Sequence, residues 1–142
     1  MVLFARDVVE KEFLSLPKET TAVEAAKLMK HQRQGFAVVK SGNESVGMVT
    51  EWDYLSKLVA EGKDPSTVTI GELMTTGIQT VQGSEGLETV AKLMADKMIR
   101  RIIVVQDGKV IGVITASTIL ARMKEYVDRI STTIARLQTP AF

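Results

Sequence analysis

The sequence has 142 residues, a net charge of +1 from 18 basic and 17 acidic side chains, and no cysteine. This charge balance, without a run of five like charges, disfavours a general nucleic-acid binder, and contents of 45% hydrophobic and 25% charged residues are typical of a folded globular protein. The lack of cysteine excludes disulfides, thiol catalysis and cysteine-based metal sites, and the single histidine, His31, cannot form a histidine cluster.

The sequence contains no segment that resembles a membrane span or a signal peptide. No apolar run approaches the ~20 residues that cross a bilayer. Near the N-terminus, Asp7 and Glu10 precede any apolar core of the kind that a secretory signal needs. We therefore expect a cytoplasmic protein with no membrane partner.

The first elements in chain order are a helical lead, a short strand and an amphipathic helix. The lead is expected at about residues 2–11 and the strand at residues 13–16. The polar residues 17–21 then provide the chemistry of a helix start. The helix that follows has one apolar face, formed at spacings of three and four by Ala22, Ala25, Ala26 and Met29.

A hairpin and a second helix complete the first half of the chain. Two β-branched runs, at residues 36–39 and 46–49, flank a turn at residues 41–44 and predict the hairpin. Residues 60–69 have the glycine and proline of a linker. Between hairpin and linker, the apolar positions of the second helix are Leu55, Leu58 and Val59.

The second half of the chain repeats this order. A helical lead at residues 70–74 and a strand at residues 78–81 precede a hairpin of residues 102–105 and 110–114, in which Asp107-Gly108 is a strong turn signal. The helix before this hairpin has its apolar face at Leu87, Val90, Ala91 and Met94.

The last helix is longer than its counterpart in the first half. Its apolar residues step by three and four, and Pro140 follows its expected end. Such a seam either packs on its own domain or forms a contact between two copies of the chain. The seam consists of Leu120, Met123, Val127, Ile130, Ile134 and Leu137.

The two halves are copies of one unit of about 60 residues. The tetrapeptide AKLM at residues 26–29 recurs at residues 91–94, and the same offset superimposes Gly47 on Gly112 and Thr50 on Thr115. Each copy therefore has the order βαββα. We predict a mixed α/β (α+β) fold with a first repeat at residues 1–66, including the N-terminal lead, and a second at residues 67–142.

This tandem βαββα unit resembles the cystathionine-β-synthase (CBS) domain family, and the pair resembles a Bateman module over residues ~5 to ~125. The resemblance implies two repeats packed with pseudo-two-fold symmetry, a nucleotide held in the cleft between them, and assembly as a homodimer. It also implies a stand-alone regulatory module without an attached enzyme.

The segment from Gly47 to Asp53, GMVTEWD, is similar to the GhxTxxD nucleotide signature of the family. There, Thr50 is expected near a phosphate at a helix N-terminus, and Asp53 is expected to accept hydrogen bonds from the two ribose hydroxyls. The alternative is a capping box, in which Thr50 and Asp53 only satisfy free backbone N–H groups. The residues alone leave both interpretations open.

The second repeat differs from the first at the positions that matter for binding. Its corresponding segment ends in Thr118 in place of Asp53, and a hydroxyl cannot accept two ribose hydrogen bonds as a carboxylate can. The family resemblance also suggests that Arg100 and Arg101 contact phosphates, with Gln34-Gly35 matched to them in the first repeat. One good nucleotide site per chain is expected, although a solvated arginine pair near a helix end is the simpler alternative.

Four further residues are candidates through the resemblance. Met48 corresponds to residues that pack on adenine, Ser15 and Leu16 to residues that line the purine pocket, and Trp52 is placed to cover a ligand or a dimer contact. Ordinary packing explains these residues equally well.

The predicted function is regulatory binding of an adenine nucleotide (AMP, ADP or ATP) without catalysis, cofactor or metal. S-adenosylmethionine and NAD are alternative ligands, and a structural or dimerisation module without ligand is the main alternative function. An enzyme is disfavoured because no nucleophile has a base beside it, and single-stranded nucleic acid is disfavoured by 5% aromatic content. The expected partners are a second copy of the chain and an effector protein.

Overall fold

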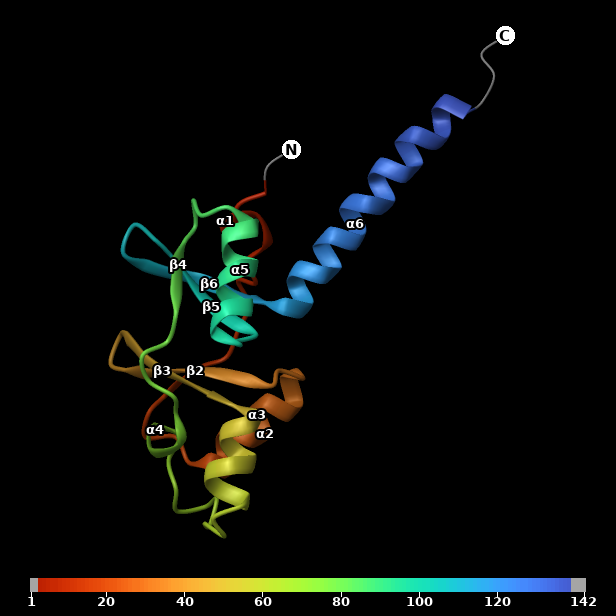
Figure 1. Cartoon of the computed structure of the whole chain (residues 1–142). Coiled ribbons are helices and arrows are strands. Elements are labelled where there is room, and N and C mark those ends of the chain that lie inside the picture. The colour runs from red at the N-terminus through yellow and green to blue at the C-terminus, as the bar shows by residue number, and fades with distance from the viewer. Residues whose placement is uncertain (1–2, 139–142) are drawn as a thin grey trace. The chain divides into compact units, whose positions relative to one another are not determined.

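The computed structural model describes residues 3–138, which form two compact units. One unit contains residues 12–79, and the other contains the N-terminal segment up to residue 11 together with the chain from residue 80 onward. Each unit has a three-stranded sheet and helices (Figure 1). The predicted mixed α/β fold is therefore confirmed.

The first unit is built on a sheet of order β1-β2-β3. Strand β1 (Ser15–Pro17) pairs in parallel with β2 (Phe36–Ser41), which forms an antiparallel hairpin with β3 (Glu44–Thr50). Helix α2 (Ala22–Gln32) connects β1 to β2 and begins at Thr21, whose hydroxyl accepts a hydrogen bond from the Glu24 backbone. The core of this unit consists of Leu14, Ala22, Ala25, Met29, Ala37, Val39, Val49, Leu58, Ile70 and Leu73.

Two further helical segments cover the core of the first unit. Helix α3 (Glu51–Asp53) continues directly into a π-helical segment, η1 (Tyr54–Val59), as the second helix of the predicted repeat. Helix α4 (Ile70–Leu73) packs against α2 and η1, and it begins with a capping box of Thr69 and Glu72. The hydrogen bonds that Thr69 donates lower the pKa of the Glu72 carboxyl.

The second unit repeats this architecture. Strand β4 (Thr80–Gln82) pairs in parallel with β5 (Arg101–Gln106), which pairs antiparallel with β6 (Lys109–Thr115). Helix α5 (Leu87–Lys97) connects β4 to β5, and helix α1 (Ala5–Val8) packs in the same unit. Its core consists of Ala5, Val8, Val81, Leu87, Val90, Met94, Ile102, Val104 and Ile114.

The two hairpins match in detail, as the sequence repeat predicts. Each carries a register shift at the same place, between Val39 and Lys40 in one and between Val104 and Val105 in the other. The turn of the second hairpin has φ of 52° at Asp107 and 75° at Gly108, the left-handed pair that a type I′ turn requires.

The two lead segments are exchanged between the compact units, so that each lead packs with the strands of the other half of the chain. Glu10 exchanges two backbone hydrogen bonds with Val113 of β6, at 2.9 and 3.0 Å. Thr75 exchanges two with Met48 of β3, at 3.1 and 2.8 Å. Each lead thus bonds to the last strand of a repeat in the other half of the chain, because that strand has a backbone edge free to pair there. The first lead is also a shorter helix than predicted, with Met1 and Val2 outside the described residues.

Gly47 and Gly112 permit these contacts. They occupy equivalent positions in β3 and β6, and each faces the lead segment that crosses its strand. A Cβ at Gly112 would overlap the carbonyl oxygen of Glu10, and one at Gly47 would overlap the side chain of Met74. The approach of the Glu10 backbone therefore requires glycine at Gly112, whereas a Cβ at Gly47 would meet the movable end of the Met74 side chain and lie 3.0 Å from the Thr75 oxygen.

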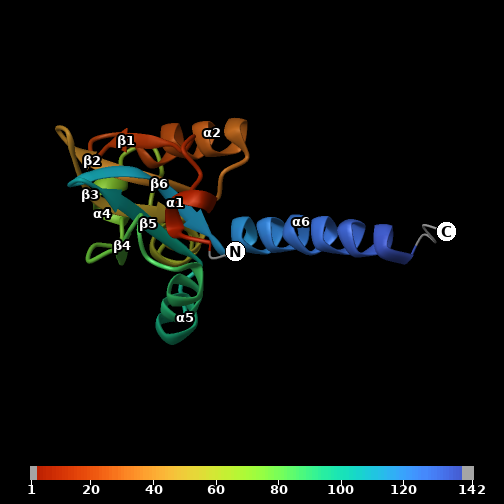
Figure 2. The same cartoon turned by 90° about the horizontal axis from the view of Figure 1, so that it is seen from above.

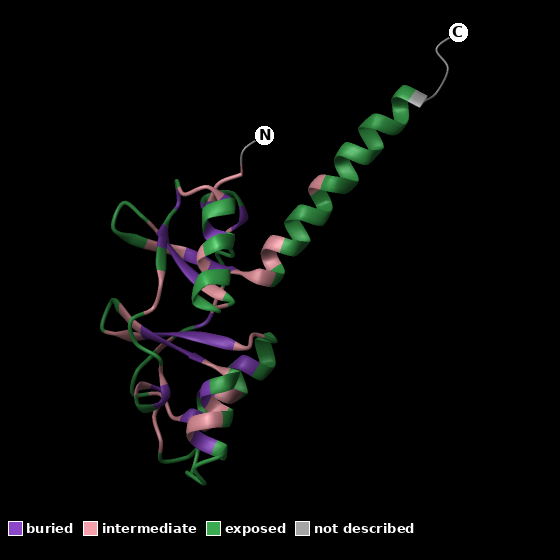
Figure 3. Cartoon of the chain, in the orientation of Figure 1, coloured by how far each residue is buried: buried purple, intermediate pink, exposed green. Residues whose placement is uncertain are grey.

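Helix α6 (Ala116–Ala135), followed by the 3₁₀ turn η2 (Arg136–Gln138), projects away from the sheet of its own unit (Figure 1, Figure 2). None of its residues is buried (Figure 3). The interpretation that its apolar seam packs on its own domain is therefore wrong, while Pro140 lies outside the described residues. No helix within residues 3–138 combines the length and apolar character needed to cross a membrane.

Tyr54 fixes the start of η1 to helix α2. Its hydroxyl donates a hydrogen bond of 2.6 Å to the backbone oxygen of Ala22, and its ring packs against the first core. Burial raises the pKa of Tyr54 from 10.0 to about 12, because the phenolate would lose hydration.

We expect Tyr54 to make the protein sensitive to alkaline pH. Below pH 10 the side chain is neutral in both folded and unfolded chains, so its contribution is complete. Between pH 10 and about 12 only the unfolded chain loses this proton, and the free energy of unfolding falls. Urea unfolding across this range should show a steeper decline for the wild-type protein than for Tyr54→Phe. Equal slopes would contradict the assignment.

We expect Gly112→Ala to destabilise the second unit by about 2 kcal/mol, because the new methyl group must displace the backbone of the N-terminal lead. Limited proteolysis should cut the lead faster in this variant, and urea unfolding should measure the loss. The control is Gly86→Ala, because a Cβ at Gly86 meets nothing within 4 Å. If both variants unfold alike, the lead does not depend on the close approach at Gly112.

Candidate functional site

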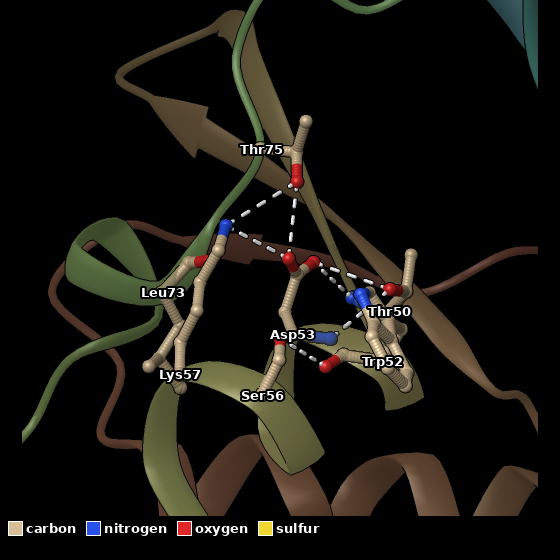
Figure 4. A network of polar contacts seen from close by, with 7 residues as sticks. All are labelled: Thr50, Trp52, Asp53, Ser56, Lys57, Leu73 and Thr75. Atoms are coloured by element: carbon tan, nitrogen blue, oxygen red, sulfur yellow. Dashed lines mark hydrogen bonds and ion pairs between the residues drawn. The ribbon is translucent and has the colours of Figure 1, made fainter. Parts of the chain in front are cut away.

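The candidate site begins where β3 ends and α3 begins. The Thr50 backbone N–H donates a 2.9 Å hydrogen bond to Oδ2 of Asp53, and the Thr50 hydroxyl donates to the same oxygen at 3.2 Å. In return, the Asp53 N–H donates to the Thr50 hydroxyl at 3.4 Å. The capping box that the sequence left open as the alternative is therefore present, and it fixes the orientation of the Asp53 carboxylate (Figure 4).

The other carboxylate oxygen of Asp53 faces two side chains. The Thr75 hydroxyl donates to Oδ1 at 3.0 Å, and Nζ of Lys57 lies 2.9 Å from it (Figure 4). Asp53 is 3% exposed and is the one buried charged residue among those whose burial the structure describes. A charge removed from water in this way needs close hydrogen-bonding partners, and Asp53 has them on both oxygens.

Lys57 connects this carboxylate to the lead segment of the second repeat. Its ammonium donates to the backbone oxygen of Leu73 at 3.0 Å, at the C-terminal end of α4, and lies 3.5 Å from the Thr75 hydroxyl. The side chain is 42% exposed, so the ion pair itself contributes little stability in water. The network nevertheless joins α3, η1 and the segment after α4 at one carboxylate.

Lys57 and Thr75 were not identified as site residues from the sequence. Lys57 stands four residues after Asp53, a helical spacing that favours an ion pair. This signal was present in the sequence. No local signal marks Thr75. Its position follows from its backbone pairing with Met48, and only the folded chain brings these two distant residues together.

The structure places six predicted site residues in the first unit. Met48 is 5% exposed on β3, and Trp52 is 68% exposed beside Asp53. Ser15 is exposed, and Leu16 is half-buried and packs against the first core. Thr50 and Asp53 are in direct contact, whereas the roles proposed for Ser15, Leu16, Met48 and Trp52 stay predictions.

Arg100 and Arg101 lie in the second unit, and their match to the first repeat differs from the one predicted. Arg101 pairs with Thr115 as Phe36 pairs with Thr50, so Arg100 corresponds to Gly35 and Arg101 to Phe36. The backbone pattern agrees, because the Arg100 oxygen accepts from the Ala116 N–H and the Gly35 oxygen from the Glu51 N–H. The predicted match to Gln34-Gly35 was one residue out of register.

Gln34 has a structural role. Its side-chain oxygen accepts from the Leu14 N–H at 2.9 Å, and its amide nitrogen donates to the Glu12 oxygen at 3.2 Å. The corrected register leaves the difference between the repeats intact, because neither Gly35 nor Phe36 carries a positive charge.

The second repeat has a cap of a different kind. The Thr118 N–H donates to the Thr115 hydroxyl at 3.0 Å, and the two hydroxyls share a hydrogen bond of 2.7 Å. The helix start is satisfied without a carboxylate. A buried negative charge is therefore present at only the first of the two equivalent helix starts.

A cavity of about 360 Å³ lies in the first unit. Helix α2 contributes Met29 and Lys30 to its wall, and Glu51 and Tyr54 contribute the other side. None of the predicted site residues lines it. In residues 3–138, no group of three or more histidine, cysteine, aspartate or glutamate side chains is arranged to hold a metal.

The fold and the duplicated cap agree with a comparison of the sequence against known families. The CBS domain profile matches twice, at residues 5–60 and 70–125. The chain belongs to the CBS domain family. The resemblance noted from the sequence is therefore confirmed, and each CBS repeat corresponds to one βαββα unit with its lead.

Curated relatives align with most of the chain. The chain is 34% identical over 116 residues to an uncharacterized protein of Methanopyrus kandleri, covering 80% of this chain and 59% of that protein. It is 26% identical to hypoxic response protein 1 of Mycobacterium tuberculosis, covering 86% of each. The chain thus spans a little over half of the first relative's length.

Solved structures have the same fold. A hexameric CBS-CP12 protein from bloom-forming cyanobacteria is 34% identical with a TM-score of 0.77, covering 84% of this chain and 67% of that one. A CBS domain pair in complex with 5′-methylthioadenosine and S-adenosyl-L-methionine is 25% identical with a TM-score of 0.77, covering 89% and 99%.

We expect Asp53→Ala to lower the free energy of unfolding of the first CBS repeat by about 2 kcal/mol. The change removes the helix cap and leaves the Thr50 N–H and the Thr75 hydroxyl without their acceptor. The control is Thr118→Ala at the equivalent helix start, where one neutral hydroxyl pair is lost. Urea unfolding that gives the two variants the same loss would contradict a special role for the Asp53 carboxylate.

Proposed function

We propose that this CBS pair is a regulatory module that binds an adenosine-containing ligand, AMP, ADP or ATP in the first place, without catalysing a reaction. The observation that carries the proposal is the buried Asp53 carboxylate, presented by its capping box at the motif that the family resemblance associates with ribose binding. The adenosyl compounds bound to the related CBS pair support this ligand class.

The two oxygens of Asp53 suggest how a ribose would be accepted. Oδ2 is held by the backbone and hydroxyl of Thr50 and maintains the helix start. Oδ1 is held by the side chains of Thr75 and Lys57 alone, and side chains can rotate away. The two hydroxyls of a ribose that replace these two donors leave the number of hydrogen bonds to Oδ1 unchanged, so the net cost of the exchange is small.

Displacement of Lys57 from Asp53 by a ribose would also release a positive charge next to the ligand. Its ammonium is 42% exposed and is held by Asp53 and the Leu73 oxygen. Once a ribose occupies Oδ1, this ammonium is free to contact a phosphate or carboxylate of the ligand. We propose the same phosphate-binding role for Arg100 and Arg101, and the adenine contacts for Ser15, Leu16, Met48 and Trp52.

The network also suggests a route for regulation. Thr75 and Leu73 belong to the segment that leads from the first unit into β4 of the second. A ligand that takes Oδ1 changes the anchoring of this segment, and it favours the arrangement in which Thr75 and Lys57 are released. A second copy of the chain or an effector protein would then receive the change.

A structural module without ligand is the second candidate, because every acceptor position of Asp53 already has a protein partner. In that case the carboxylate only holds three segments of the first unit together. The two functions differ in their response to adenosine compounds.

Titration calorimetry of the full chain should separate them. We expect one ligand per chain to bind among AMP, ADP, ATP, 5′-methylthioadenosine, S-adenosylmethionine and NAD. Asp53→Ala should weaken binding at least about tenfold, and Arg100→Ala should weaken the phosphate-bearing ligands more than 5′-methylthioadenosine. Measurements at low temperature, with circular dichroism as a check, keep the Asp53→Ala protein folded.

Thr118→Ala is the matched control, because it alters the equivalent cap in the second repeat without touching Asp53. Its affinity should equal that of the wild-type protein. If none of these compounds binds the wild-type chain, or if Asp53→Ala binds as tightly, the structural module is the better account.

A further inference from the structure

The cavity of about 360 Å³ in the first unit has no residue in common with the adenosine site proposed above. Its volume lies within the roughly 300–1,000 Å³ that is typical of small-molecule pockets. Ala26, Met29 and Tyr54 give it a mainly apolar wall, and Met29 is 7% exposed. The Tyr54 hydroxyl already donates to the Ala22 backbone oxygen, so Tyr54 offers a ligand its ring. Such a wall suits the apolar part of a small molecule.

Charged side chains line the same cavity from two sides. Lys30 lies in the last turn of α2, and Arg33 caps the end of that helix. Glu51 contributes a carboxylate from the first turn of α3. Gln34 also lines the cavity, but both the oxygen and the nitrogen of its side chain are bonded to backbone groups of the first unit. The lining therefore combines two positive charges with one negative charge.

The second repeat builds the same corner without these charges. Helices α2 and α5 have equal lengths, and both end at a left-handed residue, with φ of 54° at Arg33 and 53° at Met98. The apolar frame is retained, with Ala91 and Met94 in place of Ala26 and Met29. The fold of this corner therefore does not depend on the charged lining. In the second repeat the equivalents of Lys30, Arg33, Glu51 and Tyr54 are Ala95, Met98, Ala116 and Ile119.

The combination of charges in the first repeat narrows the class of ligand. A hydrophobic anion would be attracted by Lys30 and Arg33 and repelled by Glu51, and a hydrophobic amine would meet the reverse. A ligand with both charges on an apolar body meets an opposite charge at each end. The guanidinium of arginine binds a carboxylate through two parallel hydrogen bonds, which favours a carboxylate as the anionic end. A small molecule with a carboxylate, an ammonium group and an apolar side chain is an α-amino acid.

We propose that this cavity binds a free α-amino acid with an apolar side chain. Lys30 and Arg33 receive its carboxylate, Glu51 receives its ammonium group, and Met29 and Tyr54 contact its side chain. The site is separate from the contacts proposed for adenosine compounds, so either proposal can fail without the other.

Titration calorimetry of the full chain with L-phenylalanine and L-leucine tests the site. At least one of the two should bind, with one molecule per chain. For the tighter of them, the acid without the ammonium group is 3-phenylpropanoate or 4-methylpentanoate, and the amine without the carboxylate is phenethylamine or 3-methylbutylamine. Both the acid and the amine should bind at least about tenfold more weakly than the amino acid, because each lacks one of the two matched charges.

Arg33→Gly removes the guanidinium from the site without opposing the backbone, because glycine is the residue that a left-handed helix end favours. The affinity for the amino acid should fall at least about tenfold, while circular dichroism shows a folded chain. Met98→Gly is the matched control, with the same replacement at the same φ in the second repeat, and should bind as the wild-type protein does. Lys30→Ala should also weaken binding, and it introduces the residue that the second repeat carries at Ala95.

Glu51→Gln tests the contact with the ammonium group. This change should weaken binding of the amino acid more than binding of the acid that lacks the ammonium group. Three results would each overturn the proposal: neither amino acid binds, the acid binds as tightly as the amino acid, or Arg33→Gly and Met98→Gly have equal affinities.

Discussion

The first repeat depends on the buried carboxylate of Asp53 finding enough hydrogen-bond donors out of water. A buried charge is tolerated only where several donors replace its hydration. Here the donors come from Thr50 at the end of β3, from Lys57 on η1 and from Thr75 after α4. Each donor belongs to a different segment. Because the Asp53 carboxylate needs all of these hydrogen bonds, it holds the three segments in a single arrangement.

This constraint explains why two copies of one unit differ in character. The second repeat retains the threonine cap and a cation at the position of Lys57, namely Arg122, which likewise donates to a backbone oxygen of a lead segment. It has Thr118 in place of the aspartate, and two hydroxyls complete the cap without a charge. The scaffold of both repeats is therefore the same, and the charge that could be used for binding is present at one helix start.

Much of the fold could be predicted from the sequence, because its determinants are local. Apolar spacing identified α2 and α5, and the Asp107-Gly108 turn fixed the second hairpin. The exchange of the lead segments could not be predicted, because the pairing of Glu10 with Val113 joins residues far apart in the chain and depends on which strand edge is free. The same reason explains the site: Thr50 and Asp53 are three residues apart, so their contact as a cap could be considered from the sequence, whereas Thr75 reaches Asp53 only through the exchanged lead.

The exchange also bears on how the repeats depend on each other. If a single repeat were excised at the linker, its last strand would lose the lead segment of the other repeat that pairs with it. Its own lead segment would also lose the strand with which it pairs. Gly112 shows how tightly the first of these contacts is built, since a methyl group there would overlap the Glu10 backbone. The stability of each unit therefore depends on both repeats being present. The same holds for the position of Thr75 and for the hydrogen bond that it donates to Asp53. The Asp53 carboxylate is linked in this way to the second repeat, because the segment that holds Thr75 is also the start of that repeat.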